Sequence, residues 1–383
     1  MRDIIHILIL TCTLLALNGC QSNQTDTTFD LLTSVQKIDS LLKSHHQEDL
    51  FHGGIMISNN GENIYENYLG IADRTWNIPM QSDVKFDIAS LNKSMIAALI
   101  LKATEENKLH LDDKLVDLLS GFSFEGNFHP DITLHHLLSH SSGLLDYDAI
   151  PNELKAENFL KFKRLRLNNE EYINFISQIE PVLQPDQRFY YSNFAYHLLA
   201  IILEKTYEKP FGQVFKENLT LPLGLKNTLS ENRNEIVIEN LAPAYNYQEK
   251  TDSWYQNPFI DLSLGRRVFS TVSDLNRWAQ VMDNPGYLSQ HSLNLMQQNH
   301  VTHLSNNISY GYGWVVVDSV NQSQMGYLDI NKPYIIHGGS TDGYKAMLVN
   351  INHGEYIISF CSNVGDQTNE LQLTQEIVKL LIE

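Results

Sequence analysis

The spacing of hydrophobic residues changes character along the chain. Residues 29–50 carry leucine, valine and isoleucine three and four positions apart, which predicts an amphipathic helix. Short apolar runs at residues 53–58 and 64–69 flank Asn59-Asn60-Gly61-Glu62, and this arrangement indicates a β-hairpin. From Ser90 to about residue 290, helical spacing dominates and long loops intervene. The clearest helices of this region are predicted at residues 90–107, 131–140, 194–207 and 273–282.

Strand patterns return near the end of the chain, and a last helix follows them at residues 369–382. The predicted strands are rich in valine, isoleucine and tyrosine and cover residues 313–318, 334–337, 345–351 and 355–361. Because strands occur at both ends of the chain with helices between them, we expect an α+β fold. In this fold an antiparallel sheet is built from both chain ends and is flanked by the N- and C-terminal helices. A mostly helical lobe is inserted over about residues 90–300.

The first twenty residues have the features of an export signal. Residues 4–17 form an apolar segment that is shorter than the roughly 18 residues of a membrane-spanning helix. The sequence Leu17-Asn18-Gly19-Cys20 follows and resembles the lipobox of bacterial lipoproteins, in which the cysteine becomes the lipidated first residue. We therefore expect a lipoprotein signal peptide over residues 1–19, a polar tether over 20–28 and a folded domain over 29–383. A plain secretory signal or an uncleaved anchor is the alternative.

These expectations place the protein in the cell envelope. It would be exported and held by a lipid on Cys20 at the outer membrane or at another membrane that faces the periplasm. Signal cleavage would leave Cys20 and Cys361, and because Cys20 would carry the lipid, no disulfide framework is expected.

Composition and charge exclude other classes of protein. The chain has 383 residues, of which 43% are hydrophobic and 19% charged, as in ordinary globular proteins and unlike disordered ones. A total of 27 lysines and arginines against 45 acidic residues gives a net charge of −18. Nucleic acid is a poor partner for such a chain, because phosphates attract basic surfaces. The sequence contains no phosphate-binding glycine loop and no dinucleotide fingerprint, and we expect no cofactor.

Ser90 and Lys93 form a Ser-x-x-Lys pattern, which places both side chains on one face of a helix. A lysine with its ordinary pKa of ~10.4 is protonated, but burial lowers the pKa until the amine can take a hydroxyl proton. The same spacing begins at Ser34, Ser40 and Ser82, and only Ser90 opens a long apolar helix that would bury its lysine. On spacing alone, Ser90 could equally be a helix N-cap.

Three further motifs carry candidate chemistry. Tyr191-Ser192-Asn193 precedes an apolar helix, where the alternative is an Asn193 cap and a Tyr191 packed in the core. His337-Gly338-Gly339-Ser340 ends a predicted strand, where paired glycines would admit a ligand close to the backbone and the alternative is a plain turn. His136 and His140 lie four residues apart, but no third ligand is evident, so we expect structural roles and no metal site.

The order of these motifs resembles that of the beta-lactamase-related serine hydrolases. This family includes class C beta-lactamases, D-alanyl-D-alanine carboxypeptidases, D-aminopeptidases and related esterases. Seven segments in family order carry the resemblance, which spans about residues 30–383: residues 86–94, 132–144, 189–196, 221–225, 268–275, 310–314 and 337–339. The resemblance implies the beta-lactamase/transpeptidase-like fold.

The resemblance also implies roles for individual residues. Ser90 would be the nucleophile that forms an acyl-enzyme, and Lys93 and Tyr191 would share the general base and acid work. Asn193 would hydrogen-bond a substrate amide. The backbone N–H groups of Ser90 and Ser340 would form the oxyanion hole.

The third motif departs from that of class C beta-lactamases. His337-Gly338-Gly339 stands where those enzymes usually have Lys-Thr-Gly, so His337 would bind substrate in place of a lysine and Gly339 would line the site. A neutral histidine removes a fixed positive charge, and the glycine at the middle position removes a hydroxyl. Both changes argue against strong beta-lactam recognition. Arg266 and Arg267 could face the cleft and favour an acidic substrate, but we expect exposed loop charges.

The sequence thus predicts an envelope-anchored serine hydrolase that cleaves an amide or ester bond through an acyl-enzyme on Ser90. A peptidase or esterase acting on a small molecule or peptide is favoured. A true class C-like beta-lactamase and a non-catalytic ligand-binding homologue are the alternatives.

Overall fold

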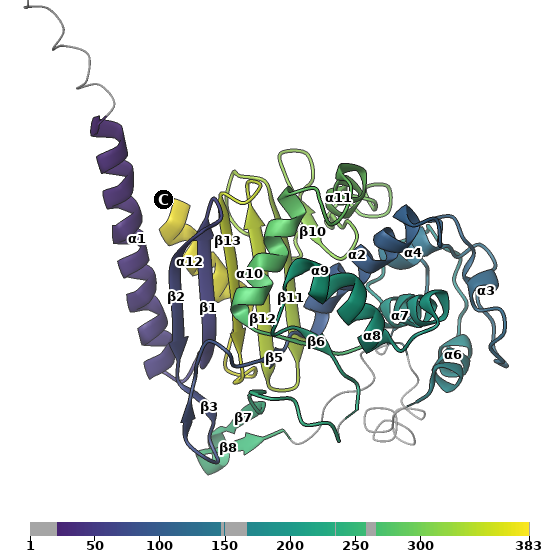
Figure 1. Cartoon of the computed structure of the whole chain (residues 1–383), viewed down its shortest axis with the longest axis horizontal. Coiled ribbons are helices and arrows are strands. Elements are labelled where there is room, and N and C mark those ends of the chain that lie inside the picture. Colours follow the sequence, from purple (N-terminus) through teal and green to yellow (C-terminus); the bar gives the residue numbers. More distant parts are fainter. Residues whose placement is uncertain (1–20, 147–148, 150–166, 234, 258–265, 383) are drawn as a thin grey trace, which may run out of the picture.

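The computed structural model describes residues 21–146, 149, 167–233, 235–257 and 266–382 (Figure 1). Its centre is a six-stranded sheet with the order β10-β11-β12-β13-β1-β2, in which every neighbouring pair is antiparallel. β1 pairs with β13, with Gly53 opposite Ser362, so both ends of the chain build one sheet as predicted. The strands are β1 (Gly53–Asn59), β2 (Glu62–Leu69), β10 (Val315–Val317), β11 (Tyr334–Thr341), β12 (Tyr344–Ile351) and β13 (Tyr356–Ser362).

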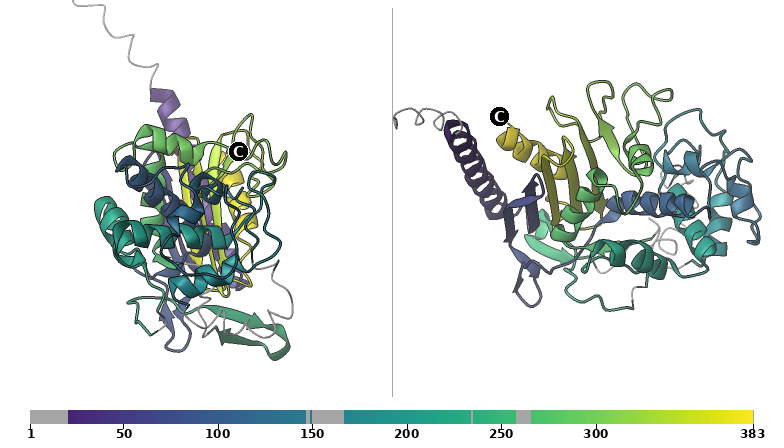
Figure 2. Two further views of the ribbon diagram at one scale, coloured as in Figure 1. Left: turned by 90° about the vertical axis from the view of Figure 1, so that its right-hand side faces the viewer. Right: turned by 45° about the horizontal axis from the view of Figure 1, so that its top comes forward.

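Different helices cover the two faces of this sheet (Figure 2). α1 (Gln21–Gln47) and α12 (Glu370–Ile382) cover one face, and α10 (Val272–Gln280) covers the other. Side chains alternate along β12 accordingly: Met347 belongs to the core formed with α1 and α12, and Leu348 to the core that contains α10.

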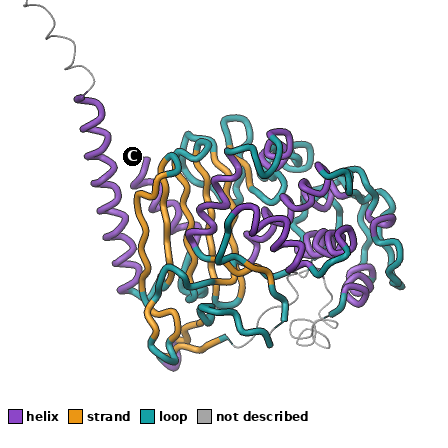
Figure 3. Tube along the Cα trace, viewed as in Figure 1, coloured by secondary structure: helices purple, strands orange, loops and turns teal. Residues whose placement is uncertain are grey.

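Apart from α10, the helices of the inserted segment gather in a second lobe beside the sheet (Figure 3). α2 (Asn92–Glu105) and α7 (Asn193–Tyr207) pack together at its centre. Most of their residues are buried, on every face of each helix. The other helices of the lobe are α3 (Leu115–Leu118), α4 (Leu134–Leu138), α6 (Asn169–Ser177), α8 (Phe211–Phe215), α9 (Leu221–Leu223) and α11 (Gln290–Gln297). The short strands are β3 (Ile71–Asp73), β4 (Ile78–Pro79), β5 (Phe86–Asp87), β6 (Leu229–Ser230), β7 (Tyr245–Gln248), β8 (Ser253–Gln256) and β9 (Val268–Ser270).

Two helices differ from their predicted lengths. α1 begins at Gln21, so residues 21–28, predicted as a polar tether, are helical, because no glycine or proline interrupts them. α4 is shorter than predicted. Thr133 caps its start by accepting the backbone N–H of His136, and His140 beyond its end has a left-handed backbone with φ of +56°.

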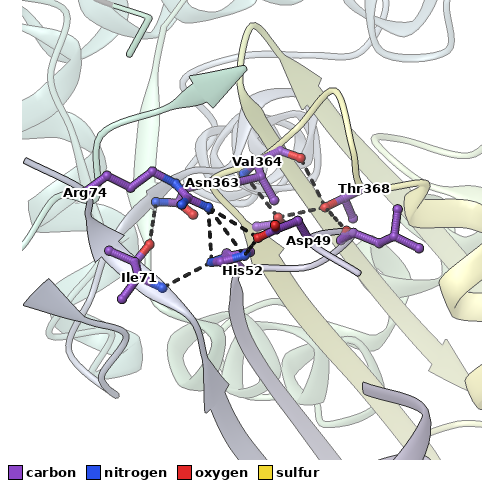
Figure 4. Close-up of polar contacts among 9 residues, drawn as sticks. Asp49, His52, Ile71, Arg74, Asn363, Val364 and Thr368 are labelled. Atoms are coloured by element: carbon purple, nitrogen blue, oxygen red, sulfur yellow. Dashed lines mark hydrogen bonds and ion pairs between the residues drawn. The ribbon is translucent and has the colours of Figure 1, made fainter. Parts of the chain in front are cut away.

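A partly buried polar cluster joins the two ends of the chain at one end of the sheet (Figure 4). His52 Nε2 lies 2.7 Å from Asp49 Oδ1, and the Arg74 guanidinium lies 3.8 Å from Asp49 and 3.7 Å from the Trp254 ring. Asn363 donates its side-chain amide to backbone carbonyls of β3. Burial lowers the pKa of His52 to about 4, so the ring is neutral and serves the fold.

Within the described residues, no helix combines the length and the apolar character needed to cross a bilayer. Cys20 and the predicted signal peptide, residues 1–19, lie outside the described residues. Cys361 is a free, buried thiol on β13.

Candidate active site

Ser90 lies in a tight turn between β5 and α2. It belongs to a short 3-10 helix (Ala89–Leu91) and is not the N-cap of α2, which is Leu91. Ala89 adopts a left-handed backbone with φ of +45°, a conformation that costs a non-glycine residue about 1–3 kcal/mol. Asp87 Oδ1 accepts the backbone N–H of Ala89 at 2.9 Å and thereby holds this turn in place.

β11 passes directly against the turn that carries Ser90. A Cβ atom on Gly339 would lie 2.1 Å from the carbonyl oxygen of Ile88, so only glycine fits there. The sequence suggested that the paired glycines leave room for a ligand. In the structure, the backbone of Ile88 occupies that space beside Gly339. The prediction that the strand ends at His337 is wrong, because the glycines stay paired with β12 and the strand runs on past the exposed Ser340.

Arg266 and Arg267 are not exposed loop charges, and that expectation is wrong. Arg267 is 5% exposed and places its Nε and terminal nitrogen 2.9 and 2.8 Å from Asp87 Oδ2. Arg266 forms an ion pair with Glu204 at 2.7 Å. Arg267 therefore supports the Ser90 turn through Asp87, because the same carboxylate accepts the backbone N–H of the turn.

The amine of Lys93 is buried next to the hydroxyl of Ser90. Its side chain leaves the first turn of α2, and the residue is 2% exposed. Its Nζ donates to Ser90 Oγ at 3.1 Å and to Asn193 Oδ1 at 2.8 Å. Burial lowers the pKa of Lys93 to about 7, although the carboxylate of Asp146 acts in the opposite direction. A large share of Lys93 is therefore neutral near physiological pH.

Tyr191 completes the group around Ser90. Its ring centroid lies 5.0 Å from Lys93 Nζ. Burial raises the pKa of Tyr191, and a hydrogen bond with Ser90 acts against that rise. The structure thus brings Ser90, Lys93 and Tyr191 together, although Tyr191 is about a hundred positions away in sequence.

Asn193 is the first residue of α7, and its amide joins Lys93 to a buried acid. Asp146 Oδ2 accepts the backbone N–H of Asn193 at 2.9 Å and its Nδ2 at 2.8 Å. These bonds turn the Oδ1 atom of Asn193 toward Lys93. Asp146 was not singled out in the sequence, where its only signal is an acid in an apolar stretch shortly after His140.

His337 lies within β11 and is 5% exposed. Its Nδ1 lies 2.7 Å from the carbonyl oxygen of Gly338, and its Nε2 lies 3.1 Å from the hydroxyl of Tyr310. Because a carbonyl only accepts, the Nδ1–H donates and Nε2 accepts from Tyr310. Burial and nearby Lys93 lower the pKa of His337 to about 4. The ring is therefore neutral, and protein groups engage both of its nitrogens.

Comparison with known proteins identifies the family of the chain. The family model described as Beta-lactamase matches residues 38–380. The chain belongs to the beta-lactamase family. It is a serine hydrolase with the α+β fold of that family, as the sequence predicted.

Two curated relatives of the chain are penicillin-binding protein 4* of Bacillus subtilis (strain 168) and protein flp of Staphylococcus aureus (strain MW2). The first is 25% identical over 347 residues, which cover 86% of this chain and 72% of the relative. The second is 24% identical over 339 residues, which cover 87% of this chain and 64% of the relative.

Solved structures share the fold at low sequence identity. EstCE1, described as a hydrolase with promiscuous acyltransferase activity, superposes with a TM-score of 0.76 at 21% identity, covering 94% of this chain and 100% of its own. A D-amino acid amidase from Ochrobactrum anthropi SV3 superposes with a TM-score of 0.70 at 19% identity, covering 92% of this chain and 98% of its own.

Arg267→Met tests the support beneath Ser90. Asp87 would remain buried without its partner, so the free energy of unfolding should fall by about 3–5 kcal/mol in urea titrations. Arg233→Met is the matched control, because Arg233 pairs with Glu231 at the surface, where solvent screens the pair, and its loss should leave the free energy of unfolding almost unchanged. Equal losses in the two variants would show that the buried pair contributes no more than a surface pair.

Proposed function

We propose that this protein hydrolyses an ester or amide through an acyl-enzyme on Ser90. The observation that supports the proposal most strongly is the buried amine of Lys93, 3.1 Å from Ser90 Oγ and with its pKa lowered to about 7. A neutral amine at this distance can accept the hydroxyl proton as Oγ attacks a carbonyl carbon.

The remaining steps follow from the same groups. Attack converts the carbonyl oxygen into an oxyanion, for which the backbone N–H groups of Ser90 and Ser340 are the proposed donors. Collapse of this intermediate breaks the bond to the alcohol or amine, which leaves with a proton delivered by Lys93 and Tyr191. Water then loses a proton to the same pair and attacks the acyl carbon, which releases the acid and restores the Ser90 hydroxyl.

The surroundings of His337 support a substrate that carries no carboxylate at this position. The ring is neutral, and its two nitrogens bond to Gly338 and Tyr310. A beta-lactam carboxylate would gain no positive charge from it, so an esterase or a peptidase is favoured over a beta-lactamase. Gly339 and Ser340 would line the acyl site along β11, and Asn193 would bond a substrate amide. The non-catalytic alternative has no support, because all three reacting groups are present and in contact.

Covalent labelling of Ser90 tests the reaction. A fluorophosphonate probe should label the wild-type protein, and Ser90→Ala should abolish labelling because the attacking oxygen is gone. Ser82→Ala is the matched control, because Ser82 also begins a Ser-x-x-Lys pattern but is exposed, and it should label as the wild type does. Labelling of Ser90→Ala at the wild-type rate would overturn the proposal. The same proteins, assayed with short acyl esters, D-amino-acid amides and nitrocefin, would separate the substrate classes.

The labelling rate should depend on pH through Lys93. The protonated amine cannot accept a proton, so the rate should rise about tenfold per pH unit below pH 7 and level off above it. Asp146→Asn removes the carboxylate that stabilises the ammonium form, so the midpoint should move to lower pH. A midpoint near 10, the ordinary value for lysine, would contradict the lowered pKa of Lys93, and a rate that does not change with pH would exclude Lys93 as the base.

We also propose that the enzyme is lipid-anchored in the cell envelope through Cys20. The described helix begins one residue later, at Gln21, and its 27 residues correspond to about 40 Å of helix. Its later turns pack against the sheet, so the N-terminal turns that project beyond the sheet in Figure 1 would separate the hydrolase domain from the bilayer surface.

Cys20→Ala tests the anchor, because no other residue of the lipobox pattern can carry the lipid. After fractionation of a bacterial host, the wild-type protein should sediment with membranes and the variant should be soluble or remain unprocessed. Wild-type protein that is soluble, or a variant that sediments to the same extent, would contradict the anchor without bearing on the reaction.

A further inference from the structure

His140 lies next to the active site but takes no part in the proposed reaction. It follows α4 and is fully buried, and its backbone is left-handed with φ of +56°. Such a backbone costs a non-glycine residue about 1–2 kcal/mol, so the surrounding contacts must hold it there.

Three contacts connect His140 to the segment that carries Tyr191. The backbone N–H of Tyr190 donates to the carbonyl of His140 at 2.9 Å. The backbone N–H of Ser192 donates to His140 Nδ1 at 3.1 Å. The rings of His140 and Tyr191 lie 4.3 Å apart at an angle of 33°. One residue therefore fixes both neighbours of Tyr191 and one face of its phenol ring.

These contacts require an uncharged imidazole. Because Ser192 donates to Nδ1, this nitrogen must be an acceptor, and the ring proton lies on Nε2. Burial, together with Lys93 and His337, lowers the pKa of His140 well below its ordinary value. The ring also lies 4.9 Å from Tyr310 and 5.0 Å from Tyr196, so aromatic side chains enclose it and limit its movement.

We infer that His140 is a positioning residue for Tyr191, which it holds in place to exchange protons with Ser90. His140 reaches the reaction only through Tyr191 and touches no reacting atom. The inference rests on the proposed function, in which Tyr191 moves a proton. Because a displacement of about 1 Å can cost on the order of 100-fold in rate, loss of these contacts should slow the reaction more than it weakens binding.

Two substitutions of His140 separate its acceptor from its ring. Asn keeps an acceptor near the position of Nδ1 and tolerates a left-handed backbone, whereas Phe keeps the ring and loses the acceptor. The readout is fluorophosphonate modification of Ser90, resolved into the maximal rate constant and the half-saturating probe concentration. We expect His140→Phe to lower the maximal rate about 100-fold and His140→Asn to stay within about tenfold of the wild type. Half-saturation should change less than twofold in both.

His136→Ala is the stability control. It removes the side chain that completes the α4 capping box, so the melting temperature should fall while the maximal rate stays at the wild-type value. If His140→Phe does not fold, His140→Ala replaces it, because alanine also lacks the acceptor. A wild-type rate in the variant that lacks the acceptor, or rates that follow melting temperature across all variants, would overturn the inference.

Tyr191→Phe and Ser90→Ala distinguish the two possible failures. Labelling that survives Ser90→Ala contradicts the proposed function itself. A wild-type rate in Tyr191→Phe would show that Tyr191 does not transfer a proton, and the inferred role of His140 would then have no basis. A slow Tyr191→Phe combined with an unaffected His140→Phe contradicts the role of His140 alone.

Discussion

The burial of one lysine amine is the constraint on which the site depends. Lys93 is 2% exposed, and an ammonium ion in such surroundings loses most of its hydration. The protein provides hydrogen bonds at Ser90 Oγ and Asn193 Oδ1, and among the residues that the structure describes no carboxylate pairs directly with the amine. Asp146 contacts Asn193 and acts on Lys93 from beyond it. This arrangement leaves the amine near the point where it loses its proton, as a general base requires.

The constraint also explains why the sheet and the helical lobe must meet at this point. Ser90 and Lys93 come from the start of α2, Tyr191 and Asn193 from the start of α7, and His337 from β11. α2 and α7 pack against each other, and β11 packs against the Ser90 turn through Gly339. The packing of α2, α7 and the sheet therefore determines where the side chains of the site lie. Ala89 and His140, which have left-handed backbones, lie in the loops that connect these elements to the site.

Much of the fold could be predicted from hydrophobic spacing, because each main strand and helix carries a clear period. The predictions were wrong where tertiary contacts override that period. α4 stops early because Thr133 and His140 fix the chain on either side of it, and β11 continues through two glycines because β12 supplies their partners. In the site, the order of motifs singled out Ser90, Lys93 and Tyr191. The roles of Asp146 and of the Asp87–Arg267 pair could not be predicted, because their partners are distant in sequence.

The charges in the site explain why a histidine suits position 337. A permanent cation there would repel the ammonium form of Lys93 and lower its pKa further, and it would attract anionic substrates. His337 is neutral and bonded to Tyr310 and Gly338, and His140, whose ring packs against Tyr191, is neutral as well. Among the described groups around Ser90, Lys93 is thus the one whose protonation changes close to neutral pH. The proposed cleavage of neutral esters and amides agrees with this arrangement, in which burial lowers the pKa of Lys93 and uncharged rings surround its amine. The carboxylate of a beta-lactam would meet no permanent cation at position 337.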